Sequence, residues 1–245
     1  AERVPEVLAK YEGEIQELKI KVAEKGQSLA DDIARVAAAR EALPNARLKV
    51  DANMGYTLAG ALEALRKLCE YGIIYAEQPV ASIEDMAALR FAIAKEGLPA
   101  RIAADESIRK AEDPLKVARA NAADLMVIKA APLGGVRRAL ALVEQAQLPA
   151  VVSSALESSV GIGVGASLAA SLPTLRYGCG LGTVSLMAED VSDEPLIARD
   201  GFMDLRTITP SPQRLERLAT DEQTRQWWVE RVTACYRVLE RACGL

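Results

Sequence analysis

Five short segments that each end in a charged residue constrain the fold of this chain more than any other feature. Helix-like segments separate these five segments. The charged ends of the five segments lie 24 to 30 residues apart, at Lys21, Asp51, Glu77, Asp105 and Lys129. Alternation of strand and helix at this spacing is typical of stacked βα units, which build a parallel sheet. Most of the segments are apolar, as expected for strands covered on both faces. The sequence therefore predicts an α/β fold.

Seven strands and the helices between them are expected. The strands cover residues 18–22, 48–51, 73–77, 101–105, 125–129, 150–153 and 177–180. The helices cover residues 2–17, 29–43, 58–71, 83–95, a stretch from about 113, 136–147, about 161–170 and 213–243, with a short hairpin around Asp200-Gly201. A closed TIM-like (β/α) barrel has one strand more. We therefore expect residues 1–182 to form barrel strands 2 to 8, without the first, and residues 183–245 to complete the barrel with the hairpin and a helix.

Charge and composition exclude several classes of function. The net charge of −4 and the dispersed basic residues give no electrostatic footprint for nucleic acid. No stretch is apolar for long enough to span a bilayer, and the first residues lack the apolar core of a secretory signal. The four cysteines form no CxxC pair, which favours reduced thiols in a cytoplasmic protein. The chain has no histidine, so a general base must be Lys, Asp, Glu, Tyr or Cys.

Three carboxylates end consecutive expected strands. In an α/β barrel the carboxyl ends of the strands meet at one mouth, so Asp51, Glu77 and Asp105 should converge there. Carboxylates at one point repel one another unless a cation lies between them. Oxygen-only ligands in this number suit Mg²⁺, with Mn²⁺ also possible. The alternative is that each acid only caps the helix after it, which does not explain the like positions in successive units.

Lysines flank the carboxylates in the sequence. Lys21 ends the strand before Asp51, and Lys129 ends the strand after Asp105, so the two lysines would face each other across the metal. A lysine near a cation gives up its proton more readily and can act as a base. The alternative for each lysine is a structural salt bridge. Lys19 points the same way as Lys21 and is either a substrate contact or a solvated neighbour.

Polar residues near the strand ends are further candidates. Asn53 could orient a ligand or a metal-bound water, or could be an ordinary turn residue. Ser153 and Ser154 could bind an anion, or could cap the next helix. The metal and the lysines together predict removal of a proton next to a carboxylate, followed by stabilisation of the enediolate by the metal and the second lysine.

The motifs that hold these residues resemble the enolase superfamily, in its muconate-lactonising subgroup. Sites of that superfamily combine a Lys or His base with Mg²⁺. The matching segments are Lys19-Ile20-Lys21, Asp51-Ala52-Asn53, Glu77-Gln78-Pro79, Ala104-Asp105-Glu106-Ser107 and Ile128-Lys129. Longer matches, at residues 132–136, 153–161 and 179–183, most resemble the o-succinylbenzoate-forming dehydratases of actinobacteria.

The resemblance implies a role for each matching position. The implied Mg²⁺ ligands are Asp51, Glu77 and Asp105. Lys21 would be the acid and base on one face of the substrate, and Lys129 would stabilise the enediolate from the other. Ser153 and Gly180 match positions near the succinyl group of the substrate. The implied reaction removes water from 2-succinyl-6-hydroxy-2,4-cyclohexadiene-1-carboxylate and gives 2-succinylbenzoate for menaquinone synthesis.

The resemblance also leaves alternatives. Members of the family carry an α+β capping domain and a first barrel strand ahead of the segment that begins here, and that domain closes over the substrate and contacts the C-terminal segment. The remaining candidates are an N-acylamino acid racemase, a dipeptide epimerase, a muconate cycloisomerase and a truncated barrel without catalysis. The expected partner is a small-molecule carboxylate substrate, and neither a nucleic acid nor a membrane is expected as a partner. The chain could be a monomer or a homo-oligomer.

Overall fold

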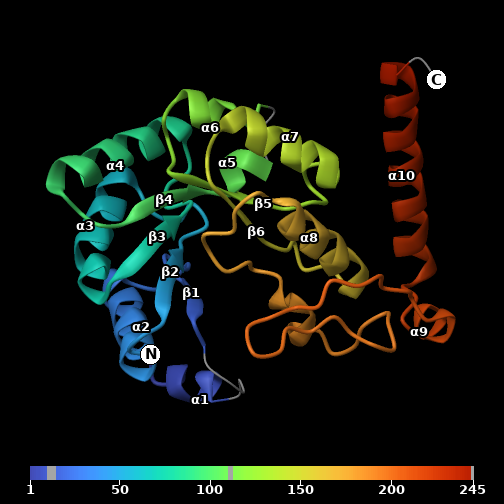
Figure 1. Cartoon of the computed structure of the whole chain (residues 1–245), viewed down its shortest axis with the longest axis horizontal. Helices are drawn as coiled ribbons and strands as arrows, with labels where there is room; N and C mark the ends of the chain where they lie inside the picture. Colours follow the sequence, from blue (N-terminus) through green and yellow to red (C-terminus); the bar gives the residue numbers. More distant parts are fainter. Residues whose placement is uncertain (10–14, 110–112, 244–245) are drawn as a thin grey trace.

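A single parallel sheet organises the molecule. The computed structural model describes residues 1–9, 15–109 and 113–243. Within these ranges six strands pair in chain order, namely β1 (Glu17–Lys21), β2 (Arg47–Asp51), β3 (Ile73–Glu77), β4 (Arg101–Ala104), β5 (Leu125–Ile128) and β6 (Ala150–Val152). All neighbouring pairs are parallel, and the sheet curves with helices along its outer side (Figure 1). This half-barrel confirms the expected TIM-like α/β class.

Helices connect the strands, and some of them start at capping residues. They are α1 (Val4–Leu8), α2 (Leu29–Ala42), α3 (Leu58–Leu68), α4 (Ile83–Glu96), α5 (Glu106–Arg109), α6 (Lys116–Arg119), α7 (Val136–Ala146), α8 (Ser159–Ser171), α9 (Pro212–Arg217) and α10 (Glu222–Cys243), with 3₁₀ turns at Cys69–Tyr71 and Gly182–Leu186. Ser28, Thr57 and Ser82 precede α2, α3 and α4, and each side chain accepts a backbone N–H of the first turn.

The expected seventh strand and the expected hairpin are each reduced to one bridging pair. Gly180 pairs only with Ser153 in parallel, because the segment around it is rich in glycine and has few side chains to pack. Near residue 200, Arg199 pairs with Phe202 across a turn in which Asp200 and Gly201 have φ of 49° and 78°. The tight turn was expected there, but no strand extends from it.

Three expected helices also differ. The helix expected over residues 2–17 is wrong at its end, because Glu17 already belongs to β1; α1 covers Val4–Leu8, and residues 10–14 lie outside the described residues. After β4 the chain forms two short helices, α5 and α6, instead of one starting near residue 113. The helix expected over 213–243 is split, because Asp221 accepts the N–H of Thr224 and starts α10 as a new helix.

The core has two parts, one on each side of the sheet. Apolar residues between the sheet and the helices form the larger part, including the buried Leu48, Ile102 and Met126. Inside the curve, a smaller cluster contains Tyr75 and Tyr177, whose rings meet edge to face 5.4 Å apart, together with Ala103, Leu125, Val127 and Val151. The sheet is therefore packed inside as well as outside, as in a barrel.

The segment before Gly180 connects the two edges of the sheet. Gly178 donates its N–H to Glu17 of β1 over 2.8 Å, and its carbonyl accepts from Lys49 of β2 over 2.9 Å. Farther along, the N–H of Gly180 reaches Val152 of β6 over 2.8 Å. Hydrogen bonds thus bridge the carboxyl end of β6, at Val152, and the amino end of β1, at Glu17.

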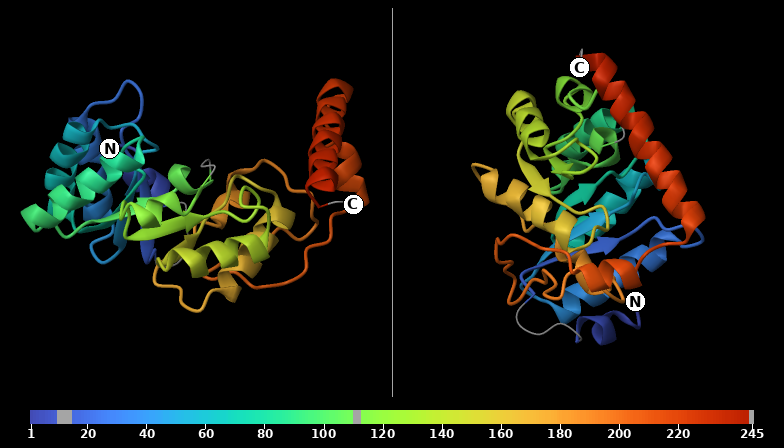
Figure 2. Two further views of the ribbon diagram at one scale, coloured as in Figure 1. Left: turned by 90° about the horizontal axis from the view of Figure 1, so that it is seen from above. Right: turned by 90° about the vertical axis from the view of Figure 1, so that its right-hand side faces the viewer.

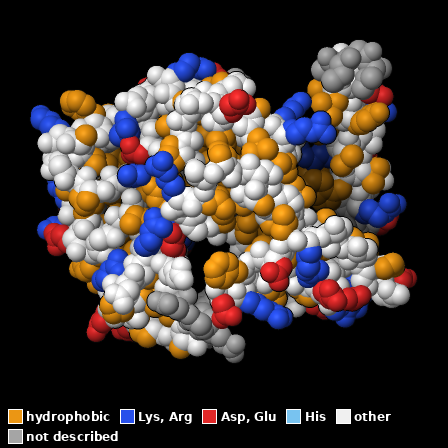
Figure 3. All heavy atoms as spheres, in the orientation of Figure 1, with side chains coloured by type: hydrophobic (Ala, Val, Ile, Leu, Met, Phe, Trp, Pro, Cys, Tyr) orange, Lys and Arg blue, Asp and Glu red, His pale blue; other side chains and the backbone are white. Residues whose placement is uncertain are grey.

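Helix α10 lies apart from the sheet and its covering helices. Figures 1 and 2 show it at the edge of the molecule, and its apolar residues are exposed, among them Trp227, Trp228, Val232 and Tyr236. Orange apolar side chains are visible on it and on the facing surface (Figure 3). None of the helices in the described part of the chain combines the length and apolar character that a membrane span requires.

Candidate metal and catalytic site

Alternation along the strands brings the predicted site residues to one edge of the sheet. Lys21, Asp51 and Glu77 are register partners at the carboxyl ends of β1, β2 and β3. Two residues earlier, on the same inward side, lie Lys19 of β1 and Tyr75 of β3. Inward-facing positions at strand ends therefore form the site.

The first half of the site is an ion-paired cluster on β1 to β3. Asp51 and Glu77 are each 1% exposed. The Nζ of Lys19 lies between them, 3.2 Å from Asp51 Oδ2 and 2.9 Å from Glu77 Oε1. Lys21 Nζ lies 2.6 Å from the same Asp51 oxygen. Two ammonium groups thus neutralise two buried carboxylates.

The second half of the site lies on β4 and β5. Asp105, also 1% exposed, directly follows β4, and Lys129 directly follows β5. Lys129 Nζ lies 2.7 Å from Asp105 Oδ2, and Arg109 Nε lies 3.1 Å from Asp105 Oδ1. Lys21 and Lys129 therefore contact the outer members of one line of three carboxylates, and their catalytic roles stay predictions.

The electrostatics of the cluster show a shortage of positive charge near Glu77. Burial raises the pKa of Glu77 to about 7, and the negative charges of Asp51 and Asp105 add to this effect against the opposing influence of Lys19. Burial alone would raise the pKa of Asp51, but Lys19 and Lys21 hold it below its usual value. Likewise, burial alone would lower the pKa of Lys19, but Glu77 and Asp51 raise it.

This donor set fits a divalent cation in chemistry. In the described part of the chain, no three Asp, Glu, His or Cys side chains already converge as a ligand group, because lysines lie between the acids. The buried donors are nonetheless all carboxylate oxygens, which suit Mg²⁺ or Mn²⁺. Burial and the charges of Asp51 and Asp105 raise the pKa of Glu77, and a cation beside this carboxylate would oppose that effect.

Asn53 links this edge to the start of α5. Its side-chain oxygen accepts from Lys21 Nζ over 2.5 Å, and its amide nitrogen donates to Glu106 Oε1 over 3.2 Å. Its backbone has a φ of 43°, a region that few residues other than glycine adopt, and its N–H reaches Asp51 Oδ1 over 3.1 Å. The positive φ agrees with the interpretation of Asn53 as a turn residue, and its role in orienting a ligand stays a prediction.

Gln78 lies beside the site, although no role for it was predicted from the sequence. It follows Glu77 with a φ of 37° and is fully buried. Its oxygen accepts the N–H groups of Asp105 and Ser107 over 3.0 and 3.1 Å, and its nitrogen donates to Ser107 Oγ over 2.7 Å. Gln78 therefore fixes Asp105 relative to Glu77. The sequence did hold a signal for Gln78 and for Glu106, since each is a polar residue directly after a strand-end carboxylate.

Ser153 and Gly180 meet each other but not the carboxylates. A Cβ atom on Gly180 would lie only 2.7 Å from Ser153 Oγ, so a larger residue at that position would force the Ser153 hydroxyl to move. Ser154 shares a hydrogen bond of 2.8 Å with Thr183. These residues form the rim of the site at the carboxyl end of β6.

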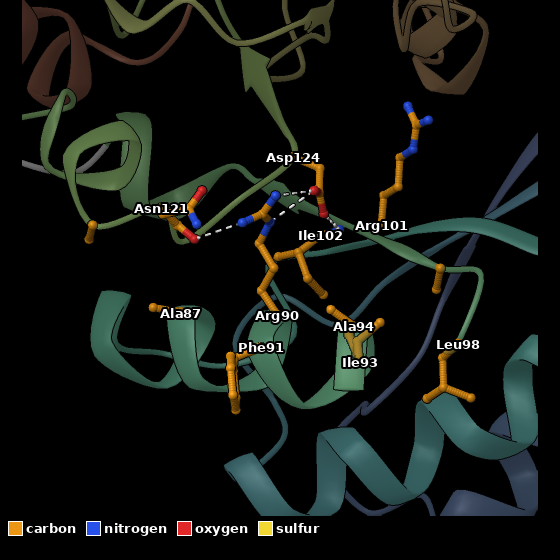
Figure 4. A pocket seen from close by; sticks show the side chains of 12 residues that line it. Ala87, Arg90, Phe91, Ile93, Ala94, Leu98, Arg101, Ile102, Asn121 and Asp124 are labelled. Atoms are coloured by element: carbon orange, nitrogen blue, oxygen red, sulfur yellow. Dashed lines mark hydrogen bonds and ion pairs between the residues drawn. The ribbon is translucent and has the colours of Figure 1, made fainter. Parts of the chain in front are cut away.

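A pocket of about 380 Å³ lies elsewhere, against α4 and the segments before β4 and β5 (Figure 4). Arg90 donates to Asp124 over 2.8 Å there, and Asp124 also accepts the N–H of Ile102 over 2.9 Å. Asp124 and Arg101 lie at the amino ends of their strands, opposite the ends that hold the lysines and carboxylates. This pocket is therefore separate from the candidate site, and the Arg90–Asp124 pair fastens α4 to the sheet.

Comparison with known proteins agrees with this geometry. Residues 2–210 match the family described as enolase C-terminal domain-like. An o-succinylbenzoate synthase of Mycolicibacterium smegmatis is 54% identical over 240 residues, which cover 98% of this chain and 72% of the relative. One of Mycobacterium leprae is 49% identical over 245 residues and 71% of its length.

Solved structures give the same relationship. The muconate lactonizing enzyme from Pseudomonas putida superposes with a TM-score of 0.73 at 27% identity, over 84% of this chain and 59% of that one. Muconate cycloisomerase from Pseudomonas fluorescens gives a TM-score of 0.72 at 29% identity, over 82% and 57%. The chain thus spans less than two thirds of these two structures. On its fold, its strand-end residues and these relatives, the chain belongs to the enolase C-terminal domain-like family of the enolase superfamily.

Proposed function

We propose that this chain performs the dehydration that forms 2-succinylbenzoate from 2-succinyl-6-hydroxy-2,4-cyclohexadiene-1-carboxylate. The observation that carries the proposal is the position of Lys21 and Lys129 at opposite ends of one line of buried carboxylates. The names of the mycobacterial relatives, which match nearly the whole chain, support this substrate. A small-molecule carboxylate substrate and a cytoplasmic location belong to the same proposal.

Asp51, Glu77 and Asp105 are the residues that would hold the divalent cation, Mg²⁺ by preference. Enzymes of this superfamily depend on such a cation, which supplies positive charge that makes the proton beside a carboxylate more acidic. The oxygen-only donors and the raised pKa of Glu77 support the assignment. The lysines that now neutralise these acids would then be available to the substrate.

The two lysines take different roles in the proposed reaction. Lys21, whose side chain is 51% exposed, takes the proton next to the substrate carboxylate and returns one to the hydroxyl that leaves as water. Lys129, whose side chain is only 11% exposed, stays charged beside Asp105 and stabilises the enediolate from the opposite face. Lys19, Asn53, Ser153 and Gly180 would contact the substrate around these lysines.

A direct assay separates this reaction from its closest competitor. The solved relatives favour muconate cycloisomerisation as a second candidate, since both named above are enzymes of that reaction. Purified chain with Mg²⁺ should convert the cyclohexadiene substrate to 2-succinylbenzoate, followed by ultraviolet absorbance, and excess EDTA should stop it. N-Succinylamino acid and cis,cis-muconate are assayed in parallel. Turnover of either one without dehydration would reject the proposal, and no Mg²⁺-dependent turnover of any would favour a barrel without catalysis.

A further inference from the structure

Glu106, the first residue of α5, is a buried carboxylate beside the site that has no part in the proposed reaction. It is 5% exposed. Its Oε2 atom has no hydrogen-bond partner among the residues that the structure describes. A buried carboxylate oxygen without a donor is costly, so the contacts of the other oxygen have to offset that cost.

The other oxygen, Oε1, is held from two sides. Asn53 Nδ2 donates to it over 3.2 Å, and Arg109 Nη2 donates over 2.7 Å. Arg109 is fixed in turn by Asp105, whose Oδ1 accepts from Nε over 3.1 Å. The Arg109 contacts keep Glu106 in place, which leaves Asn53 as the group that Glu106 can orient.

The orientation of Asn53 decides what Lys21 meets. An amide can present either its oxygen or its nitrogen in one direction. Because Glu106 accepts from the nitrogen of Asn53, the oxygen must face Lys21, whose Nζ donates to it over 2.5 Å. With the amide reversed, an N–H would point at an ammonium group and the contact would be lost. No other residue of the described chain is recorded as bonding the Asn53 side chain.

We propose that Glu106 is a positioning residue for Lys21 and acts through the side-chain amide of Asn53. Glu106 fixes the Asn53 amide, and the amide oxygen together with Asp51 sets the direction of Lys21 Nζ. The expected effect on catalysis rests on the proposed function. The orientation of Lys21 by Asn53 and Glu106 does not depend on which reaction the chain performs.

Kinetics of four variants test the route through Asn53. E106A should lower kcat for dehydration roughly 10- to 100-fold, as removal of a group that orients a reacting side chain does. E106Q keeps an acceptor oxygen for Asn53 and Arg109, so its kcat should stay within about threefold of the wild-type value. In both variants, KM and the affinity for Mg²⁺ should also stay within about threefold of the wild-type values. N53A should lower kcat at least as much as E106A, because it also removes the direct contact with Lys21, and the double variant should be no worse than N53A. A further fall in the double variant would overturn the route through Asn53.

E17Q is the matched control for general loosening of the sheet. Glu17 is also largely buried and ion-paired, with a side chain 15% exposed, but lies at the amino end of β1, away from Lys21. Its variant should keep kcat even if it unfolds at a lower temperature. A loss of kcat in E17Q equal to that in E106A would show that loss of packing, and not orientation, explains the effect.

Chemical labelling of Lys21 tests its orientation by Asn53 and Glu106 without any turnover. The purified chain is treated with an acetylating reagent, and the rate at Lys21 is followed by peptide mass spectrometry relative to Lys67, whose side chain is 58% exposed. E106A should raise the relative rate at Lys21 several-fold, and E106Q should not change it. An unchanged rate in E106A overturns the inference. If wild type shows no dehydration but the labelling changes as expected, the proposed function fails and the positioning role stands.

Discussion

Replacing Glu77 with glutamine should stabilise the chain in the absence of metal, at neutral and higher pH. The pKa of Glu77 rises from its usual 4.5 to about 7, chiefly because the group is buried. Folded protein thus binds a proton more tightly than unfolded chain, so the free energy of unfolding falls as the pH rises from below 4.5 to about 7. The gap between the two pKa values corresponds to about 3 kcal/mol. E77Q removes this charge, while Lys19 keeps its contact with Asp51.

The measurement compares the urea unfolding of wild type and E77Q in EDTA at about pH 5 and about pH 8. Between these two pH values, the difference in free energy of unfolding should change by about 2 to 3 kcal/mol in favour of the variant. Far-UV circular dichroism is the suitable probe, since Trp227 and Trp228 are exposed on α10 and do not report on the sheet. Asp51 does not interfere, because its pKa lies below its usual value and hence below this range.

Glu96 offers a matched control, because it is an exposed carboxylate paired with Arg66 and its pKa is lowered by that partner. E96Q should differ from wild type by the same amount at both pH values. An equal stability difference for E77Q at both values would refute the reasoning about buried charge. Saturating Mg²⁺ should stabilise wild type more than E77Q, since a cation favours the charged carboxylate.

Three further changes test the site and its surroundings. K21A should lower dehydration by at least about 100-fold while Mg²⁺ affinity, measured by calorimetry, stays near normal; retention of a tenth of the rate would exclude Lys21 as the base. D105N should weaken Mg²⁺ binding in the same experiment, and unchanged affinity would contradict its assignment as a ligand. G55A should destabilise the fold by about 1 to 3 kcal/mol, because its new Cβ would lie 2.6 Å from the Ala23 carbonyl oxygen beside the site. A thermal unfolding midpoint equal to that of wild type would show that the two loops separate easily.

The convergence of the charged strand ends was predictable from the sequence, because two regularities act together. Strands of a parallel sheet end at one edge, and side chains alternate between its faces. Lys21, Asp51 and Glu77 end adjacent strands in register, so their meeting needed no knowledge of the packing. Asp105 and Lys129 follow the same rule one and two strands farther along, directly after β4 and β5.

The contacts behind that edge were not predictable in the same way. Asn53 and Glu106 are 53 residues apart, and their hydrogen bond depends on the positive φ of Asn53. A pattern of apolar positions carries no information on such a backbone angle. The weakness of the pairing at Gly180 was missed for a related reason, since a short apolar and glycine-containing run predicts a strand but not how many residues of it pair.

The bridge between Glu17 and Gly178 also has a consequence for the order of folding. The two residues are 161 positions apart in the chain, so this contact closes a very large loop. During synthesis the β1–β2 and β2–β3 pairs can form as soon as their own segments emerge, and Glu17 can then pair with Arg47 and Lys49. Its hydrogen bond from Gly178 has to wait for the later segment. The contact between β1 and the segment around Gly178 is therefore expected to form in one of the slowest folding steps.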